Sequence, residues 1–394
     1  MGSSEAGTST AAIHPPVVPL NALTTLRFLA AFHVVLFHML VLHIFEGGPW
    51  WYRNFASLGY VSVECFFVLS GFILVYVYND TVDDARRFWQ ARFARIYPAY
   101  FLSLLATAPV FFYALRHVDV AYYAWSKHHF VPAVILTLGM LQAWIPHAAL
   151  TWNPVCWSLS CEAFFYLLFP LVLRWSRPLS RRALYAGVVV CSILSLSVAL
   201  AYIVVHPDGI EQMNSPQLDL TWRNILFYNP ILRLPEFLTG VFVGRLFLTR
   251  GEGNRHALPL VVGGLAVLGV MTVLFGRIPL PMIVAGFLPP AFAAIIYGLA
   301  LRPRWVAPLE TRWLVFLGEA SYSLYLLHSL VLIQVFSLTA SLPLPLRQVL
   351  APAACLVVAI LAYLVVERPG RELLRPKGRK PVRVAIGSNS IGLG

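Results

Sequence analysis

The first apolar segment contains the stretch LRFLAAFHVVLFHML, residues 26–40, in which an arginine and a histidine interrupt apolar side chains. A charged side chain in the middle of a membrane helix costs about 2.5–3.5 kcal/mol, so Arg27 indicates a functional site. Eleven residues turn a helix through about 1100°, which brings His38 to within about 20° of Arg27 and about 16 Å along the axis. Arg27 and His38 are therefore predicted to share one helix face, which His33 does not share.

The composition of the whole chain is that of a polytopic membrane protein. Hydrophobic residues make up 59% of the 394 residues and charged residues 12%, against about 25% charged in soluble domains. Runs of about 20 apolar residues recur, each long enough to cross about 30 Å of hydrocarbon. The net charge of +12 is not taken to indicate nucleic acid, because the basic residues lie in short loops between apolar runs. An all-α transmembrane bundle around a polar central cavity is the predicted fold.

The basic loops also predict the topology. If the ambiguous apolar stretch near 130–145 crossed the membrane, the basic loop RWSRPLSRR (174–182) would lie outside, against the positive-inside rule. A short non-spanning or re-entrant helix is therefore expected at 130–145, with both termini cytoplasmic and the chain in the cell membrane, as in a bacterial inner membrane. About ten spans are expected, at 22–43, 59–79, 94–114, 156–174, 183–205, 229–248, 257–275, 281–300, 314–337 and 346–366.

The ends of the chain and its cysteines add three expectations. Residues 1–20 and 370–394 are predicted to be disordered cytoplasmic segments on either side of a transmembrane domain at 21–369. No Lys or Arg precedes Arg27, so the first helix is expected to be retained rather than cleaved as a signal peptide. The five cysteines have no metal-type spacing, so neither a metal site nor a disulfide framework is expected.

Further polar side chains lie in segments that are otherwise apolar. Such residues normally face the interior of the bundle or a water-filled cavity. For a single Glu or His, an interhelical hydrogen bond is the alternative, and for a Tyr it is ordinary packing. These residues are Glu64, Glu162, Arg233, Glu236, Ser321, Tyr322, Tyr325 and His328.

A second signal is the arginine-rich stretch RRFWQARFARIYPAY at 86–100. Arg92 and Arg95 are three residues apart and are therefore neighbours on one helix face. The pair can be interpreted in two ways, either as basic residues that only set the membrane topology or as an anion-binding site. Guanidinium groups bind phosphate in a bidentate manner, and Tyr97 and Tyr100 suit a stacked base.

Together and in order, these stretches resemble the acyltransferase-3 family of integral membrane O-acyltransferases. Two positions depart from the family pattern, because Glu64 stands where Asp is frequent and Cys161 where an aliphatic residue is common. The resemblance covers about residues 20–370. It rests on LRFLAAFHVVLFH with its Arg–ten residues–His spacing, VECFFVLSGFIL, RFARIYPAY with its paired arginines, WSLSCEAFFYLLFP, RLPEFLTG, SYSLYLLH and a closing ERP.

The resemblance implies about ten helices around a polar cavity. It also implies transfer of an acyl group, usually from cytoplasmic acyl-CoA, to a hydroxyl. Family acceptors include cell-surface polysaccharides, nodulation oligosaccharides, macrolides and other glycosylated lipophiles. Some members carry an additional C-terminal esterase-like domain. This chain ends after the last span, and direct acylation of the acceptor by a single-domain enzyme is the expectation.

The site residues fit this chemistry as hypotheses. His38 is expected to be the general base for the acceptor hydroxyl, with Arg27 beside it. Glu162 or Glu64 is expected to orient the imidazole, as the acid does in a triad. Acyl-CoA is expected as a co-substrate rather than a permanently bound cofactor, held by Arg92, Arg95 and Tyr97. The acceptor is expected to contact Trp157, Arg233, Glu236, Ser321, Tyr322, Tyr325 and His328, with Ser321 and Tyr325 also suited to stabilise an oxyanion.

Two other classes of function remain open at the level of sequence. A transporter or flippase of a glycosylated or lipophilic substrate would also place Arg, Glu and His within the membrane. A scaffold subunit of a larger membrane complex would explain the 14% aromatic residues but not the buried charges. The acyl group is expected to be acetyl or another short chain, and the sequence leaves open whether the chain forms a homo-oligomer.

Overall fold

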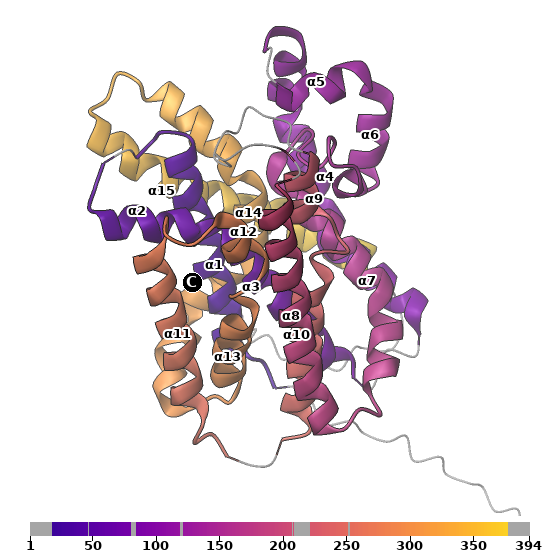
Figure 1. Cartoon of the computed structure of the whole chain (residues 1–394). Helices are drawn as coiled ribbons and strands as arrows, with labels where there is room; N and C mark the ends of the chain where they lie inside the picture. The colour runs from indigo at the N-terminus through magenta and orange to yellow at the C-terminus, as the bar shows by residue number, and fades with distance from the viewer. Residues whose placement is uncertain are drawn as a thin grey trace, which may run out of the picture.

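The computed structural model describes residues 18–45, 47–79, 84–118, 121–206, 208, 221–250 and 253–376. Helices make up most of this part of the chain, and it contains no strand. The predicted all-α class is therefore confirmed, and Figure 1 shows the helices gathered into one bundle. Most of the two predicted disordered ends lies outside the described residues. Residues 370–374, predicted as tail, instead continue the last helix.

Eight helical segments of the described chain are long and apolar enough to cross a membrane. Among them α4 begins nine residues before the predicted span, because Asp84 caps it by accepting a hydrogen bond from the Arg87 backbone N–H. The eight are α1 (Asn21–Val41), α2 (Trp50–Ser57) with η1 (Leu58–Val61) and α3 (Ser62–Tyr78), α4 (Ala85–His117), η3 (Pro154–Cys156) with α7 (Trp157–Ser176), α8 (Arg181–Val205), α11 (Ala257–Leu274), α14 (Arg312–Leu338), and α15 (Leu344–Ala362) with the π-helical turn η5 (Tyr363–Glu367) and α16 (Arg368–Leu374).

Two of the ten predicted spans are shorter than expected. Helix α10 (Leu234–Leu248) has 15 residues, about 22 Å at 1.5 Å per residue, and starts late because Pro235 favours the first turn. The predicted span 281–300 is divided into α12 (Leu280–Ala285) and α13 (Pro289–Ala300), since Pro289 and Pro290 start a new helix. Both α10 and α13 pack inside the bundle against α3.

The ambiguous stretch near 130–145 forms a short helix, as predicted. Helix α6 (Phe130–Leu138) has nine residues, about 13.5 Å, which is too short to cross the membrane. It lies beside α5 (Ala121–His128) at one end of the bundle (Figure 1). The hydroxyl groups of Tyr97 and Tyr100 on α4 donate to the carbonyls of Leu138 and Thr137 and so attach the end of α6 to α4. The remaining short elements are η2 (Gln142–Trp144), α9 (Thr221–Tyr228) and η4 (Arg304–Glu310).

Large apolar side chains remain exposed on the outer helices. Helix α8 carries exposed Val189, Ile193 and Val204, and α11 carries exposed Val262 and Val270. Exposed apolar surface of this extent is unusual for a soluble monomer, whereas hydrocarbon solvates it without cost. The bundle is therefore that of a multi-pass membrane protein.

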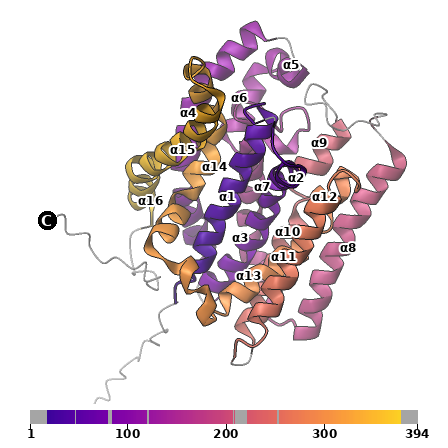
Figure 2. The same ribbon diagram turned by 90° about the vertical axis from the view of Figure 1, so that its left-hand side faces the viewer.

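Glycines bring two helix pairs into close contact at the centre of the bundle. A Cβ atom on Gly240 of α10 would lie 2.0 Å from the carbonyl oxygen of Val68 on α3. A Cβ atom on Gly318 of α14 would lie 2.1 Å from the carbonyl oxygen of Thr24 on α1. No side chain fits at either position, so α14 lies directly against α1, as Figure 2 shows. This second contact positions the candidate site.

Candidate active site

Two polar stripes face each other across the contact between α1 and α14. Arg27 and His38 lie on α1, and Ser321, Tyr325 and His328 follow one another on α14 at intervals of four and three residues. Such intervals keep side chains on one helix face. Arg27 Nη2 donates to Ser321 Oγ at 3.4 Å, and His38 contacts His328 further along. The structure therefore brings the predicted Arg27–His38 face together with the polar face of α14.

The two histidines form a direct contact. His38 Nδ1 lies 3.1 Å from His328 Nε2 and 3.0 Å from the Val34 carbonyl oxygen. His328 Nδ1 lies 2.7 Å from the carbonyl oxygen of Tyr325 and 3.2 Å from that of Leu324. The His328 side chain is fully buried, whereas His38 is partly exposed.

The hydrogen-bond network assigns the proton positions of this pair. A carbonyl oxygen only accepts, so His328 Nδ1 carries the proton and its Nε2 presents a lone pair. His38 Nδ1 faces that lone pair and the Val34 carbonyl, so it also carries its proton and donates. The remaining nitrogen, His38 Nε2, is then unprotonated. This arrangement suits proton acceptance by His38, with His328 holding the ring and its tautomer.

Tyr325 links α14 to the start of α7. Its hydroxyl lies 2.9 Å from the Val155 carbonyl oxygen and 2.8 Å from Ser158 Oγ. The side chain is 5% exposed. Both contacts of the Tyr325 hydroxyl are therefore to protein groups, and its predicted part in oxyanion or acceptor binding stays a prediction.

Arginine side chains converge at the Arg27 end of the two stripes. Arg27 is in electrostatic contact with Arg95, Glu367 and Glu162. Among the described residues the Arg95 guanidinium has no hydrogen-bond partner. Arg371 on α16 is also in electrostatic contact with Arg95. Several guanidinium groups with unused N–H donors therefore share one region, which is the chemistry of an anion site.

Arg92 borders this region and is held by aromatic rings. Its Nη2 donates to the Tyr78 hydroxyl at 2.9 Å. Its guanidinium carbon lies 5.2 Å from the centre of the Tyr78 ring and 5.9 Å from those of Phe88 and Tyr166. Stacking of this kind fixes a planar guanidinium, so Arg92 is oriented rather than free.

The two tyrosines predicted near the arginines have different positions. Tyr322 donates from its hydroxyl to the Ile96 carbonyl at 2.9 Å, which joins α14 to α4 next to Arg95. Tyr97 stacks between Phe93 and Phe101, and its hydroxyl bonds to Leu138. The structure therefore brings Tyr322 to the arginine region and turns Tyr97 toward α6. A part for Tyr97 in donor binding stays a prediction.

The two carboxylates proposed to orient His38 lie elsewhere. Glu162 hydrogen-bonds to Tyr166 and is in electrostatic contact with Arg27, Arg92 and Arg95. Glu64 is buried beside Glu236 and Arg233. Among the described residues the side chain in contact with the His38 ring nitrogens is His328, an imidazole of α14. A part for Glu162 or Glu64 in orienting His38 stays a prediction.

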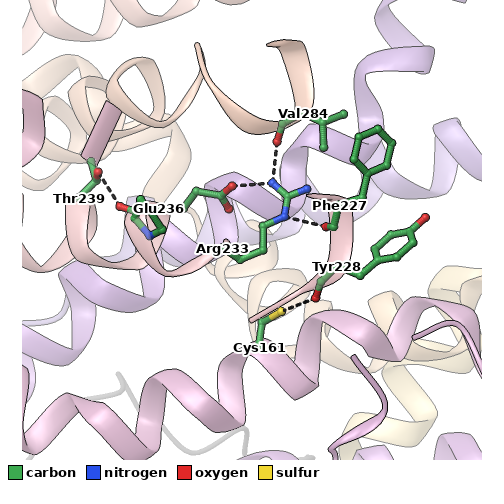
Figure 3. A network of polar contacts seen from close by, with 8 residues as sticks. Cys161, Phe227, Tyr228, Arg233, Glu236, Thr239 and Val284 are labelled. Atoms are coloured by element: carbon green, nitrogen blue, oxygen red, sulfur yellow. Dashed lines mark hydrogen bonds and ion pairs between the residues drawn. The ribbon is translucent and has the colours of Figure 1, made fainter. Parts of the chain in front are cut away.

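Arg233 is the centre of a buried polar network, drawn in Figure 3. Its Nη1 donates to Glu236 Oε1 and to the Val284 carbonyl, both at 2.6 Å, and its Nε donates to the Phe227 carbonyl at 2.7 Å. The guanidinium carbon lies 5.6 Å from the centre of the Trp157 ring. The predicted residues Arg233, Glu236 and Trp157 therefore form one cluster.

Glu64 completes this cluster in an unusual way. Among the described residues, both of its carboxylate oxygens and Glu236 Oε2 are buried without a hydrogen-bond partner. The Tyr60 hydroxyl beside them is also buried without a hydrogen-bond partner among the described residues. Buried polar atoms without partners are costly, so these atoms suit additional hydrogen-bond donors such as hydroxyl groups.

Sequence reasoning misses two features of the site. The pairing of His328 with His38 spans 290 positions, and no spacing signals it. Glu367 lies among the arginines, whereas the sequence assigns no role to the closing ERP that contains it. The sequence signal that could have identified Glu367 is its position as an acidic residue at the end of an apolar span.

Comparison with known proteins settles the family. A family model described as an acyltransferase domain matches residues 20–367, which is most of the chain. The chain belongs to this family. The resemblance seen in the sequence motifs is thereby confirmed, and the chain is a membrane O-acyltransferase.

Curated relatives support this assignment. The acyltransferase MdmB of Streptomyces mycarofaciens is 30% identical over 81% of this chain and 80% of its own length. The O-acetyltransferase OatA of Staphylococcus aureus is 24% identical over 92% of this chain, which spans 58% of OatA. The exopolysaccharide production protein ExoZ of Rhizobium meliloti is 26% identical over 79% of this chain and 90% of its own. No solved structure matches the chain.

Proposed function

We propose that this enzyme transfers an acetyl or other short acyl group from acyl-CoA to a hydroxyl of a sugar, glycolipid or other lipophilic acceptor, with His38 as the general base. The observation that carries the proposal is the His38–His328 contact. From it we assign the proton of neutral His38 to Nδ1 and the lone pair to Nε2. An imidazole so oriented, inside an acyltransferase, matches the requirement for removing a proton from a hydroxyl.

The arginine region supports acyl-CoA as the donor. CoA is a polyanion, and its phosphates require several cationic groups. Arg27, Arg92, Arg95 and Arg371 outnumber Glu162, Glu319 and Glu367 in this region, so the positive charge is in excess. The free N–H groups of Arg95 would then bind phosphate oxygens.

Helix α1 would connect the donor site to the base. Arg27 and His38 are separated by about 16 Å along the helix axis. The long, narrow pantetheine arm of CoA would extend over this distance between α1 and α14. With the phosphates at Arg27 and Arg95, the thioester would reach His38.

The reaction follows as a direct transfer. The acceptor oxygen forms a bond to the thioester carbonyl carbon while its proton passes to His38 Nε2. The carbon–sulfur bond then breaks, and the imidazolium returns the proton to the CoA thiolate. While His38 is charged, its Nδ1–H donates a stronger hydrogen bond to His328 Nε2, which stabilises the transition state.

The acceptor would bind near the Arg233 cluster. Trp157 offers a ring on which a sugar can stack, and the unpartnered oxygens of Glu64 and Glu236 would accept hydrogen bonds from hydroxyl groups. Two relatives, an O-acetyltransferase and an exopolysaccharide production protein, support acetyl transfer to a carbohydrate.

The proposed setting is the bacterial cell membrane with both termini in the cytoplasm. The basic loops favour this orientation through the positive-inside rule. It places the Arg27 end of α1 toward the cytoplasm, where acyl-CoA is available, and His38 toward the outer half.

The test is acyl transfer by the purified protein. Incubation with labelled acetyl-CoA and a panel of glycosylated acceptors should release free CoA and give an acceptor heavier by one acetyl group. Transport of a glycoside into vesicles with no CoA release from any acyl-CoA would overturn the proposal and favour a transporter.

A further inference from the structure

A wide helical turn determines the position of one carboxylate near the end of the described chain. Ala351, Cys355, Ala359, Tyr363 and Glu367 recur at intervals of four residues and are all buried. Four residues of a regular α-helix turn through about 400°, so Glu367 would lie about 160° from Ala351. The π-helical turn η5 takes up an additional residue and returns Glu367 to the buried face.

The Glu367 carboxylate is anchored on one side only. Its Oε2 accepts a hydrogen bond from Ser323 Oγ at 2.7 Å. Its Oε1 is buried and has no hydrogen-bond partner among the described residues. The side chain is 0% exposed. Burial of a half-satisfied carboxylate disfavours folding, so the unpartnered Oε1 points to a role in the site rather than in stability.

The surrounding charges indicate what that role is. Arg27 and Arg95 repel each other, and the Glu367 carboxylate attracts both. Arg371, one helical turn beyond Glu367, is attracted by the same carboxylate. The backbone around Glu367 is fixed, because a Cβ atom on Gly370 would lie 2.7 Å from Pro98 Cβ on α4. A fixed negative charge therefore lies among three long cationic side chains.

We propose that Glu367 is a positioning residue of the donor site, which holds Arg27 and Arg95 together until the phosphates of acyl-CoA bind. This inference rests on the proposed function, because it assigns Glu367 to the same arginine site. Ser323 ties the carboxylate to α14, and no ion pair between Glu367 and an arginine is present among the described residues. Glu367 thus attracts the guanidinium groups without occupying the N–H donors that bind phosphate.

The substitution Glu367→Gln tests the charge and preserves the shape. The amide oxygen still accepts the Ser323 hydroxyl, so packing is retained. We expect the Kd for free CoA and the KM for acetyl-CoA to rise about tenfold, equivalent to about 1.4 kcal/mol. The kcat and the KM for the acceptor should stay within about twofold. The control is Glu372→Gln on α16, an exposed carboxylate paired with Arg368 at 3.4 Å, which should change none of these values.

A second variant, Ser323→Ala, keeps the inference testable if Glu367→Gln does not fold. Ser323→Ala keeps the charge and removes its anchor, so a smaller rise in the same Kd is expected. Unchanged or tighter CoA binding by Glu367→Gln would overturn the inference, as would unchanged binding by Ser323→Ala if Glu367→Gln does not fold. Wild-type protein that binds no CoA would instead reject the donor site itself, and both ideas with it.

Discussion

Replacement of His328 by alanine removes the ring that accepts the His38 Nδ1 proton. The contact is a single hydrogen bond of 3.1 Å, and it becomes charge-assisted once His38 is protonated in the transition state. A hydrogen bond to a charged group contributes about 1.5–3 kcal/mol. At 1.36 kcal/mol for each factor of ten, kcat should fall about 10- to 150-fold.

The fall in kcat of His328→Ala should be smaller than that of His38→Ala. The Val34 carbonyl still accepts the Nδ1 proton at 3.0 Å, so the tautomer of His38 is preserved in the variant. The KM for acetyl-CoA should stay within about twofold, because the arginine region proposed to bind its phosphates does not contain the deleted ring.

The assay measures the initial rate of CoA release by detergent-purified protein. The acceptor is one that gains the mass of an acetyl group in the panel of glycosylated acceptors described above. His33→Gln is the matched control. It removes another imidazole of α1, whose contacts are Ser62 Oγ at 3.0 Å and the Phe55 carbonyl at 2.7 Å. It should lower thermal stability and leave kcat within about twofold. An unchanged kcat in His328→Ala would refute the reasoning, and a loss equal to that of His38→Ala would contradict the secondary role assigned to His328.

Three further outcomes follow from the structure. The double variant Arg92→Ala/Arg95→Ala should raise the KM for acyl-CoA at least about tenfold and leave the acceptor KM unchanged; equal effects on both would favour a topology role. Gly318→Ala should separate α14 from α1 and reduce kcat at least about tenfold, whereas Gly263→Ala, whose added Cβ meets nothing within 4 Å, should have no effect on CoA release. Arg233→Met leaves buried carboxylates unpaired and should destabilise the detergent-solubilised protein by about 3–5 kcal/mol; an unchanged thermal midpoint would contradict the buried ion pair.

Much of the fold could be predicted because membrane constraints act locally. The apolar runs determine where long helices such as α1 and α14 lie, and the basic loop at 174–182 correctly indicates a short helix rather than a span at 130–145. The length of α10 could not be predicted in this way. Protein side chains rather than lipid surround it, so hydrocarbon thickness does not set its length.

The site could be predicted in part for the same reason. Helical periodicity alone predicts that Arg27 and His38 share one face, and the order of the motifs indicates the correct family. The partner of His38 depends instead on how closely two distant helices approach. That distance is set at Gly318, whose missing side chain carries no hydropathy signal. A triad analogy therefore suggests a carboxylate, whereas the packing supplies His328.

Glu367 shows a further limit of periodicity. In a regular helix its spacing from Ala351 would turn it away from the bundle, and only the wide turn at Tyr363–Glu367 brings it back. A π-helical turn has no simple sequence signature, so the contact with the arginines becomes visible only in three dimensions.

The most direct test of the base is His38→Ala measured in two ways on one preparation. Free CoA binding is followed first, and transfer of labelled acetyl from acetyl-CoA to the acceptor second. The expected result is CoA binding within about twofold of wild type together with a loss of transfer of at least about 100-fold. Transfer at the wild-type rate by folded His38→Ala protein would contradict the assignment of His38 as the group that accepts the acceptor's proton.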